Sequence, residues 1–178
     1  GWRQKREILR FLKLANPNWV HTTNSAALYR LQAEGTNASH LQLFGGIPIC
    51  NGQHPPKDKK KIYALTFGTL YKTFPYEDLI NKICQIEKKC ERKVQLTLIG
   101  IQRETTGVNK LRKLADKAEI LIKETGKLST DQISLNIQNS DIGISTTPLD
   151  SLGKSMSTAT FLEHGLPVLA FDDGDTPS

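Results

Sequence analysis

From residue 62 onward, short runs of aliphatic and β-branched residues alternate with segments of helical periodicity, and this alternation limits the fold more than any other feature. Nearly all-apolar strands that alternate with helices form a parallel sheet covered on both faces. We therefore predict an α/β fold with a Rossmann-like, doubly wound parallel sheet. Strands are expected at residues 62–67, 94–99, 119–122, 142–145 and 168–171, and helices at 76–89, 108–118, 130–139 and 155–164.

The first part of the chain has the same alternation in a less regular form. A helix is expected over Gln4–Leu14, a strand over Trp19–Thr22, a helix from Asn24 or Ser25 to Leu31, and a strand over Leu41–Phe44. The stretch that follows is rich in Pro, Gly and Lys, as linkers are. We predict the end of one domain at 1–47, a linker at 48–61, and a second domain at 62–178 that is incomplete at its end.

The net charge of +6 leaves several classes of partner open. Basic residues gather at 57–61 and along the first helix, but neither group is interleaved with the aromatic residues on which single-stranded nucleic acids stack. We therefore expect no nucleic-acid partner. Solvated surface and peripheral contact with an anionic membrane both remain open.

The sequence points to a cytoplasmic protein, with the inner face of the membrane as a further option. No apolar run is long enough to cross a bilayer, and the N-terminal segment is too polar for a secretory signal. The three cysteines show no C-x-x-C spacing, so neither a disulfide framework nor a zinc site is indicated.

The loops after the predicted strands form one set, because ligands of doubly wound folds bind beyond the carboxyl ends of the strands. These loops are rich in glycine, hydroxyl groups and lysine, which suits an anion. Each of Gly68, Gly100 and Gly126 can instead serve only to close a turn. The segment Gly153-Lys154-Ser155 resembles part of a phosphate-binding loop, but Pro148 stands where that motif needs its first glycine.

The sequence therefore does not indicate a nucleotide hydrolase. It does indicate a site that binds a diphosphate. Backbone amides of Ser155, Met156 and Ser157 are expected to be free at a helix start, and Lys154 adds positive charge.

The strings QNSDIGISTTP and FLEHGLPVLAFDDGDTP resemble the group-1 (GT4-like) retaining glycosyltransferases of GT-B fold, as do LTFGTL, QLTLIG and ETGKLSTDQI more loosely. NWVHTTNSAALYRLQAEG resembles the end of that family's acceptor domain. The resemblance implies a donor substrate that is a nucleotide-diphosphate sugar, an unknown acceptor, no metal and no further cofactor. It implies Lys154 and Lys72 as catalytic residues. It implies donor-binding roles for Gly68, Thr69, Gly126, Lys127, Leu128, Gly153, Ser155, Met156, Ser157, Thr160 and Glu163.

The chain also departs from the family pattern. Thr69 and Phe74 stand where the family has a basic pair, which leaves Lys72 alone there, and Leu152 and Thr160 stand where it has two glutamates. Glu163 lies one turn after Thr160 and could take over a ribose contact, or it could be a solvated residue.

Two other groups of polar residues have structural interpretations. His21 and His164 are expected to be structural, and Asp172, Asp173 and Asp175 to be solvated loop acids rather than metal ligands. Two function hypotheses follow: the nucleotide-sugar-binding part of a retaining glycosyltransferase, inactive as this piece alone, or a non-catalytic binding module with the same fold.

Overall fold

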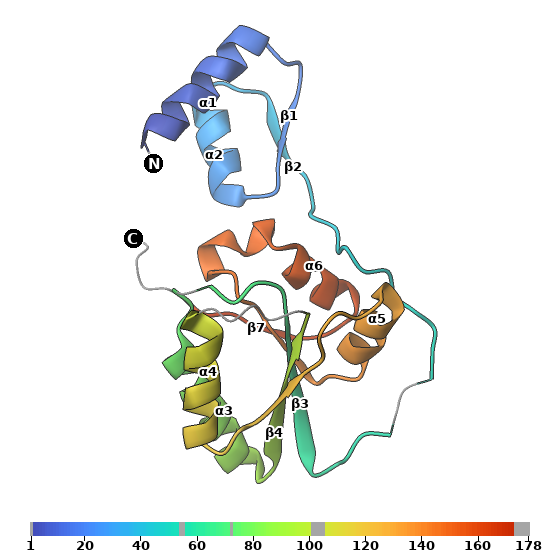
Figure 1. Ribbon diagram of the computed structural model, residues 1–178. Helices are drawn as coiled ribbons and strands as arrows, with labels where there is room; N and C mark the ends of the chain where they lie inside the picture. The colour runs from blue at the N-terminus through green and yellow to red at the C-terminus, as the bar shows by residue number, and fades with distance from the viewer. Residues whose placement is uncertain (1, 54–55, 72, 101–105, 173–178) are drawn as a thin grey trace. The chain divides into compact units, whose positions relative to one another are not determined.

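The computed structural model describes residues 2–53, 56–71, 73–100 and 106–172 (Figure 1). The chain forms two compact units, residues 1–43 and residues 44–178. Each is described by itself below. The predicted domain boundaries remain a prediction.

The first unit holds two helices and two short strands. These are α1 (Trp2–Ala15), β1 (Val20–Thr22), α2 (Ser25–Ala33) and β2 (Ala38–His40). The Asn24 side chain accepts the Ala27 backbone N–H at 2.9 Å and so caps α2. The expected strand at Leu41–Phe44 is wrong: β2 lies three residues earlier and pairs with β1 in parallel, which buries Ala38 opposite Val20. Leu41 and Phe44 are exposed beyond it.

The second unit is a five-stranded parallel sheet with helices on both faces. The strands are β3 (Lys61–Phe67), β4 (Lys93–Ile99), β5 (Leu121–Glu124), β6 (Ile142–Ile144) and β7 (Val168–Leu169), in the order β5-β4-β3-β6-β7. All pairings are parallel, so the predicted doubly wound Rossmann-like sheet is confirmed. The helices are α3 (Tyr76–Cys90), α4 (Thr106–Lys117), α5 (Thr130–Gln138) and α6 (Met156–Glu163), and a 3-10 helix, η1 (Leu149–Lys154), precedes α6.

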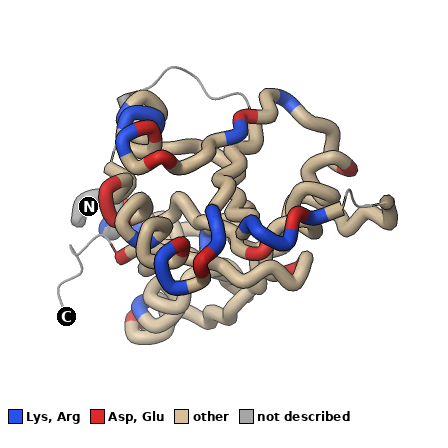
Figure 2. Tube along the Cα trace, turned by 90° about the horizontal axis from the view of Figure 1, so that it is seen from below, with Lys and Arg blue, Asp and Glu red and all other residues tan. Residues whose placement is uncertain are grey.

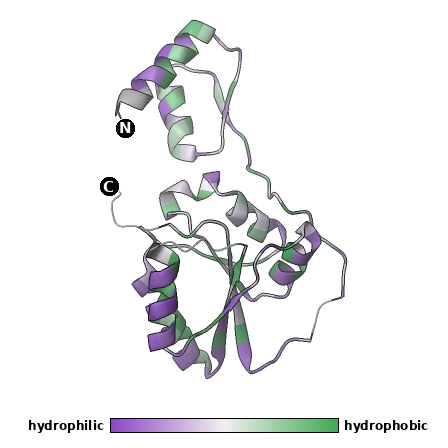
Figure 3. Cartoon of the chain, viewed as in Figure 1, coloured by the Kyte–Doolittle hydropathy of each residue, from purple (hydrophilic) through white to green (hydrophobic). Residues whose placement is uncertain are grey.

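Two apolar clusters hold the helices to the sheet, because side chains alternate between its faces. Ala64 and Leu98 belong to the cluster beneath α3 and α4. Their neighbours Leu65 and Ile99 belong to the cluster beneath α5 and α6. In Figure 3, hydrophobic and hydrophilic residues alternate along α3 and α4, as expected for helices with one buried face.

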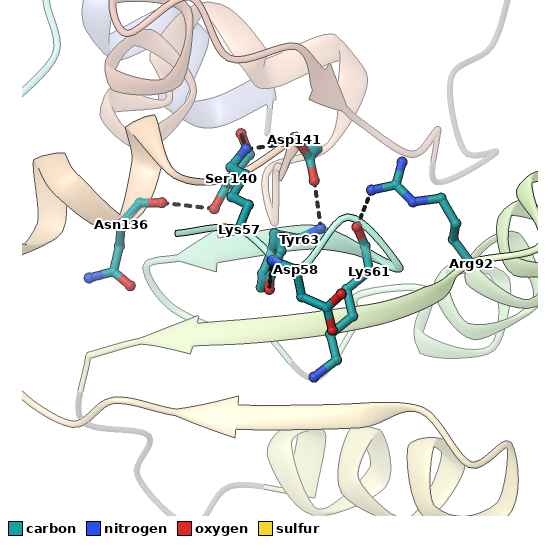
Figure 4. Close-up of polar contacts among 8 residues, drawn as sticks. All are labelled: Lys57, Asp58, Lys61, Tyr63, Arg92, Asn136, Ser140 and Asp141. Atoms are coloured by element: carbon teal, nitrogen blue, oxygen red, sulfur yellow. Dashed lines mark hydrogen bonds and ion pairs between the residues drawn. The ribbon is translucent and has the colours of Figure 1, made fainter. Parts of the chain in front are cut away.

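Residues 44–53 have no regular secondary structure, yet polar contacts bind part of them to α5. The Cys50 backbone N–H donates to Ser134 Oγ at 2.9 Å, and Gln138 Nε2 donates to the Cys50 carbonyl at 2.8 Å. Further along, Lys57 Nζ lies 2.9 Å from Asp141 Oδ1. The other oxygen of Asp141 accepts the Tyr63 backbone N–H at 2.8 Å (Figure 4). Asp141 thus joins the start of β6 to β3 and to the basic segment before it.

We expect Asp141→Asn to lower the free energy of unfolding by about 1 kcal/mol at pH 7, a value kept small because both charged groups are about one-third exposed. Burial raises the pKa of Asp141, but the Tyr63 N–H and the Lys57 ammonium together bring it below the usual value of 3.8. A carboxyl whose pKa is lower in the folded state stabilises above its unfolded pKa. In urea unfolding, the difference in the free energy of unfolding between the variant and wild type should therefore become smaller as the pH falls below about 4. Asp116→Asn, which changes an exposed acid on α4, is the matched control for the removal of one carboxylate.

Many charged residues of the second unit are paired across elements. Lys110 lies 2.8 Å from Glu77, and Arg112 lies 2.8 Å from Glu124. Figure 2 shows basic and acidic segments close together along the tube. Within the described residues, none of the helices has the length and apolar character that a membrane span requires.

Candidate functional site

The sheet order places a switch point between β3 and β6. From β3 the chain proceeds to β4 and β5 on one side, then crosses over to β6 and β7 on the other. Loops that leave β3 and β6 at their carboxyl ends therefore diverge and leave a crevice, which is where ligands bind in such folds.

Two of the predicted site residues meet at this point. Gly68 follows β3 with φ of +122°, a conformation that L side chains rarely adopt, and a Cβ atom placed on it would lie 3.9 Å from Ser157 Oγ. Gly68 and its neighbour Thr69 are exposed. The backbone after β3 thus approaches the Ser157 side chain in the first turn of α6, as the loop prediction requires.

The first turn of α6 is held by a network of hydroxyl groups. Ser155 is the N-cap, and its Oγ accepts the Thr158 backbone N–H at 3.2 Å and the Thr158 hydroxyl at 2.8 Å. The Thr158 hydroxyl also lies 3.0 Å from Ser145 Oγ, at the end of β6. These contacts fix the helix start against the sheet.

One of the backbone N–H groups predicted to be free at this turn already forms a hydrogen bond within the protein. The Ser155 backbone N–H donates to the Leu152 carbonyl at 3.0 Å, so the expectation that this amide is free is wrong; η1, which the sequence did not predict, supplies the acceptor. Met156 and Ser157 are the first two residues of α6, where backbone N–H groups have no acceptor within the helix. Lys154 and Gly153 are exposed at the end of η1.

The predicted base-binding residues lie at the neighbouring strand ends. Gly126 has φ of +66°, and its carbonyl accepts the Gly100 N–H at 3.1 Å, which joins the ends of β4 and β5. Leu128 packs against the cluster beneath α5 and α6, whereas Lys127 is exposed. Lys72, the second predicted catalytic residue, lies outside the described residues, as do Asp173 and Asp175.

Thr160 and Glu163 contact a glycine pair, Gly45-Gly46, to which the sequence analysis assigned no role. Glu163 Oε1 accepts the Gly45 backbone N–H at 3.0 Å, and Thr160 Oγ1 accepts the Gly46 N–H at 3.0 Å. The Thr160 hydroxyl also donates to the Met156 carbonyl at 2.8 Å, and Thr160 is fully buried. If either side chain contacted the nucleotide-sugar donor, that contact would have to share or replace these hydrogen bonds. Their predicted donor-binding roles remain predictions.

Glycine is required at both positions because this segment approaches α6 closely. A Cβ atom on Gly45 would lie 2.8 Å from Thr160 Cα, and one on Gly46 would lie 2.6 Å from Met156 Sδ. The signal that could have found this contact was the pair Gly45-Gly46 itself, since adjacent glycines also mark places where two backbones come together.

We expect Glu163→Ala to speed hydrogen exchange of the Gly45 amide about tenfold, because it removes one hydrogen bond to a charged acceptor. Glu163→Gln keeps a neutral acceptor at the same place and should give an intermediate rate. Equal exchange rates in all three proteins would show that the hydrogen bond between Gly45 and Glu163 does not hold this segment in solution.

His164 takes part in a partly buried polar network, in agreement with the structural role expected for it. Its Nδ1 lies 2.8 Å from the Thr160 carbonyl, which can only accept, so Nδ1 carries the proton. Nε2 lies 2.9 Å from Ser134 Oγ, and Ser134 is fully buried. His21 lies in the first unit, with Nδ1 2.8 Å from Ser39 Oγ.

Sequence reasoning also missed a cavity of about 240 Å³ at the carboxyl ends of the strands. It is formed by the loop after β3, the turn after β6 and the residue Phe171 beyond β7. Its lining residues are Tyr71, Thr73, Phe74, Pro75, Thr146, Thr147, Pro148 and Phe171.

Comparison with known proteins finds similarity in structure alone. No protein-family profile matches the chain, and no curated protein sequence matches it. Sucrose-phosphate synthase from Thermosynechococcus elongatus is similar with a TM-score of 0.56 and 14% identity, over 94% of this chain and 44% of that one. HepE of Anabaena, in complex with UDP and glucose, is similar with a TM-score of 0.55 and 18% identity, over 90% and 46%.

A Staphylococcus aureus TarM variant, in complex with fondaparinux, α-GlcNAc-glycerol and UDP, is similar with a TM-score of 0.51 and 14% identity, over 88% of this chain and 30% of that one. These three proteins are GT-B glycosyltransferases. The second unit has their Rossmann-like fold. At such identities the likeness concerns the fold, and the chain spans less than half the length of each of these proteins.

Proposed function

We propose that the chain is the nucleotide-sugar-binding part of a group-1 retaining glycosyltransferase of GT-B fold. The observation that supports the proposal is the first turn of α6, which starts with the backbone amides of Met156 and Ser157 and brings Ser157 Oγ within 3.9 Å of a Cβ atom placed on Gly68 at the switch point. Two proteins of similar fold have been crystallised with UDP. The whole protein would transfer the sugar to an acceptor that the chain does not identify.

The proposed chemistry assigns a role to each group at this turn. Departure of the sugar leaves negative charge on the diphosphate, and amides that are already oriented stabilise that charge without reorganising. The exposed Lys154 ammonium adds a positive charge beside the two amides. Lys72, Gly126, Lys127 and Leu128 are proposed as further donor contacts, on the resemblance alone. We propose that no metal is required, so chelation with EDTA should leave nucleotide affinity unchanged.

A thermal-shift titration with UDP, GDP, ADP and their sugars tests the proposal. A ligand at one hundred times its Kd stabilises the folded state by about 2.7 kcal/mol. We expect one nucleotide to raise the melting temperature and inorganic phosphate at equal ionic strength to raise it much less. Absence of stabilisation by every nucleotide at millimolar concentration would contradict the proposal.

The second candidate is a non-catalytic binding module, and a specific observation favours it. Leu152 and Thr160 occupy the two places where the resemblance calls for glutamates, and Thr160 and Glu163 bind the backbone of Gly45 and Gly46. Sugar transfer or donor hydrolysis by the full-length protein separates the two candidates. Turnover that Lys154→Ala reduces would exclude the binding module.

Peripheral contact with a membrane and a cytoplasmic location remain proposals. The proposed membrane contact rests on basic residues of α1 such as Arg10 and Lys13, which are exposed, whereas the proposed location rests on the sequence alone. Sedimentation of the protein with vesicles that contain anionic lipid, compared with neutral vesicles, measures the first.

A further inference from the structure

A polar cluster attaches the segment before β3 to α5 and to the end of α6. At its centre is the buried hydroxyl of Ser134, which lies 2.9 Å from each of three nitrogen atoms: the Cys50 backbone N, Gln138 Nε2 and His164 Nε2. Gln138 Nε2 also donates to the Cys50 carbonyl at 2.8 Å, so Cys50 is bound through both its N–H and its carbonyl. We call these four residues the Cys50 latch.

The hydrogen atom of each contact with Ser134 can be assigned. A serine hydroxyl has one hydrogen to donate and two lone pairs that accept. The Cys50 backbone N–H can only donate. The Gln138 nitrogen is also a donor, because its second contact is the Cys50 carbonyl, which can only accept. These two donors occupy both lone pairs of Ser134 Oγ, so its own hydrogen is donated to His164 Nε2.

The latch therefore requires a neutral imidazole. His164 Nδ1 donates to the Thr160 carbonyl at 2.8 Å, and Nε2 accepts from Ser134, so the ring carries one proton, on Nδ1. A second proton would be on Nε2 and would point at a hydroxyl that has no lone pair left to accept it. The charged ring is accommodated only if Cys50 or Gln138 gives up its bond to Ser134. Proton uptake thus acts against the attachment of Cys50.

Other titratable groups on the same elements differ in contact or in position. Glu163, next to His164, accepts the Gly45 backbone N–H. Asp131 is exposed in the first turn of α5, and the Cys50 thiol is free. Carboxyl groups ordinarily titrate below about pH 5 and thiols above about pH 8. Histidine is therefore the residue that changes charge between these limits.

We propose that the Cys50 latch is a proton-controlled switch, closed while His164 is neutral and open when its ring is protonated. Cys50 belongs to the segment that joins the first unit to β3, so opening loosens this connection at mildly acidic pH. The contacts of Gly45 and Lys57 in the same segment use other partners and should stay closed. The switch needs no nucleotide and does not depend on the proposed function.

Amide hydrogen exchange of the whole chain at about pH 7.5 and at about pH 5.5 tests the switch. Protection factors are compared, because they remove the intrinsic pH dependence of exchange. We expect the protection of the Cys50 amide to fall about tenfold at the lower pH, the change that linkage gives for an imidazole of ordinary proton affinity that must stay neutral in the closed state. The Gly45 amide should keep its protection within about twofold. Imidazole nitrogen NMR shifts at the higher pH should place the ring proton of His164 on Nδ1.

Histidine variants assign the pH dependence to one ring. His164→Gln cannot titrate, so the protection of the Cys50 amide should become independent of pH. His21→Gln changes a histidine of the first unit, and His54→Gln changes one that follows Cys50 by four positions. Both should retain the loss of protection at the lower pH. The amide spectrum at the higher pH checks that each variant is folded.

Gln138→Met tests the lone-pair assignment on Ser134. It removes one donor, which lowers the protection of the Cys50 amide at both pH values but leaves a lone pair for the protonated ring. The change with pH should therefore shrink to about threefold or less. An undiminished change with pH in this variant would contradict the assignment.

Three other results would overturn the inference. They are a Cys50 protection in the wild-type chain that does not change with pH, a change that His164→Gln retains or His54→Gln abolishes, and a ring proton of His164 on Nε2 at the higher pH. Each of these can be obtained whether or not the chain binds a nucleoside diphosphate, so the failure of the switch and the failure of the proposed function are distinguishable.

Discussion

Gly143→Ala is expected to lower the free energy of unfolding by about 3 kcal/mol, at the upper end of what overpacking a core costs. Gly143 lies in the middle of β6, between Leu65 of β3 and Val168 of β7. A Cβ atom there would lie 2.7 Å from Cδ2 and 2.9 Å from Cγ of Phe161. Phe161 is fully buried and packs edge-on against Phe67, so its ring has no free space to move into. Urea unfolding measures the loss.

The control is a double-mutant cycle with Phe161→Leu. If the clash with the ring causes the loss, Gly143→Ala should cost at least about 1 kcal/mol less in the Phe161→Leu background than in wild type, because coupled neighbours are not additive. Additive effects would mean that the strand backbone, rather than the ring, rejects a side chain at Gly143.

Met156→Pro is expected to weaken nucleoside diphosphate binding about tenfold to a hundredfold, the value of one hydrogen bond to a charged group. Proline removes the backbone N–H but is favoured at the first position of a helix, so α6 should remain intact. Ser155 before it has φ of −92° and ψ of 104°, an extended conformation that a following proline accepts. Isothermal titration calorimetry measures the affinity.

Met156→Ala is the matched control for this variant. Both substitutions remove the side chain that lies against Gly46, but only proline removes the amide hydrogen. We expect Met156→Ala to bind within about twofold of wild type. Equal losses in the two variants would assign the effect to the side chain and would contradict a role for the amide.

The sequence predicted the sheet well because its signal there is local. The runs at 62–67 and 94–99 are flanked by turn residues, and β3 and β4 each begin one residue earlier than expected. β5 begins two residues later than expected, because the Ile120 backbone N–H bonds to the Ala115 carbonyl at the end of α4 and Glu119 has φ of +56°. Tertiary packing decides where a helix of this kind ends, and the hydrophobic periodicity of the sequence carries no information about that packing.

The candidate site was only partly predictable for the same reason. The nearness of Gly68 to Ser157 follows from the sheet order and could be expected from the alternation of strands and helices. In contrast, the use of the Ser155 amide depends on η1, and the contact between Gly45 and Glu163 joins residues 118 positions apart. The residues that line the cavity at the carboxyl ends of the strands come from separate loops, so no local sequence pattern predicts it.

A crystal structure of the chain with a bound nucleoside diphosphate tests the central claim most directly. The account predicts diphosphate oxygens within about 3 Å of the backbone nitrogens of Met156 and Ser157, with the Lys154 ammonium turned toward them. A diphosphate bound elsewhere, or amides of Met156 and Ser157 that remain bonded within the protein while nucleotide occupies another site, would contradict it.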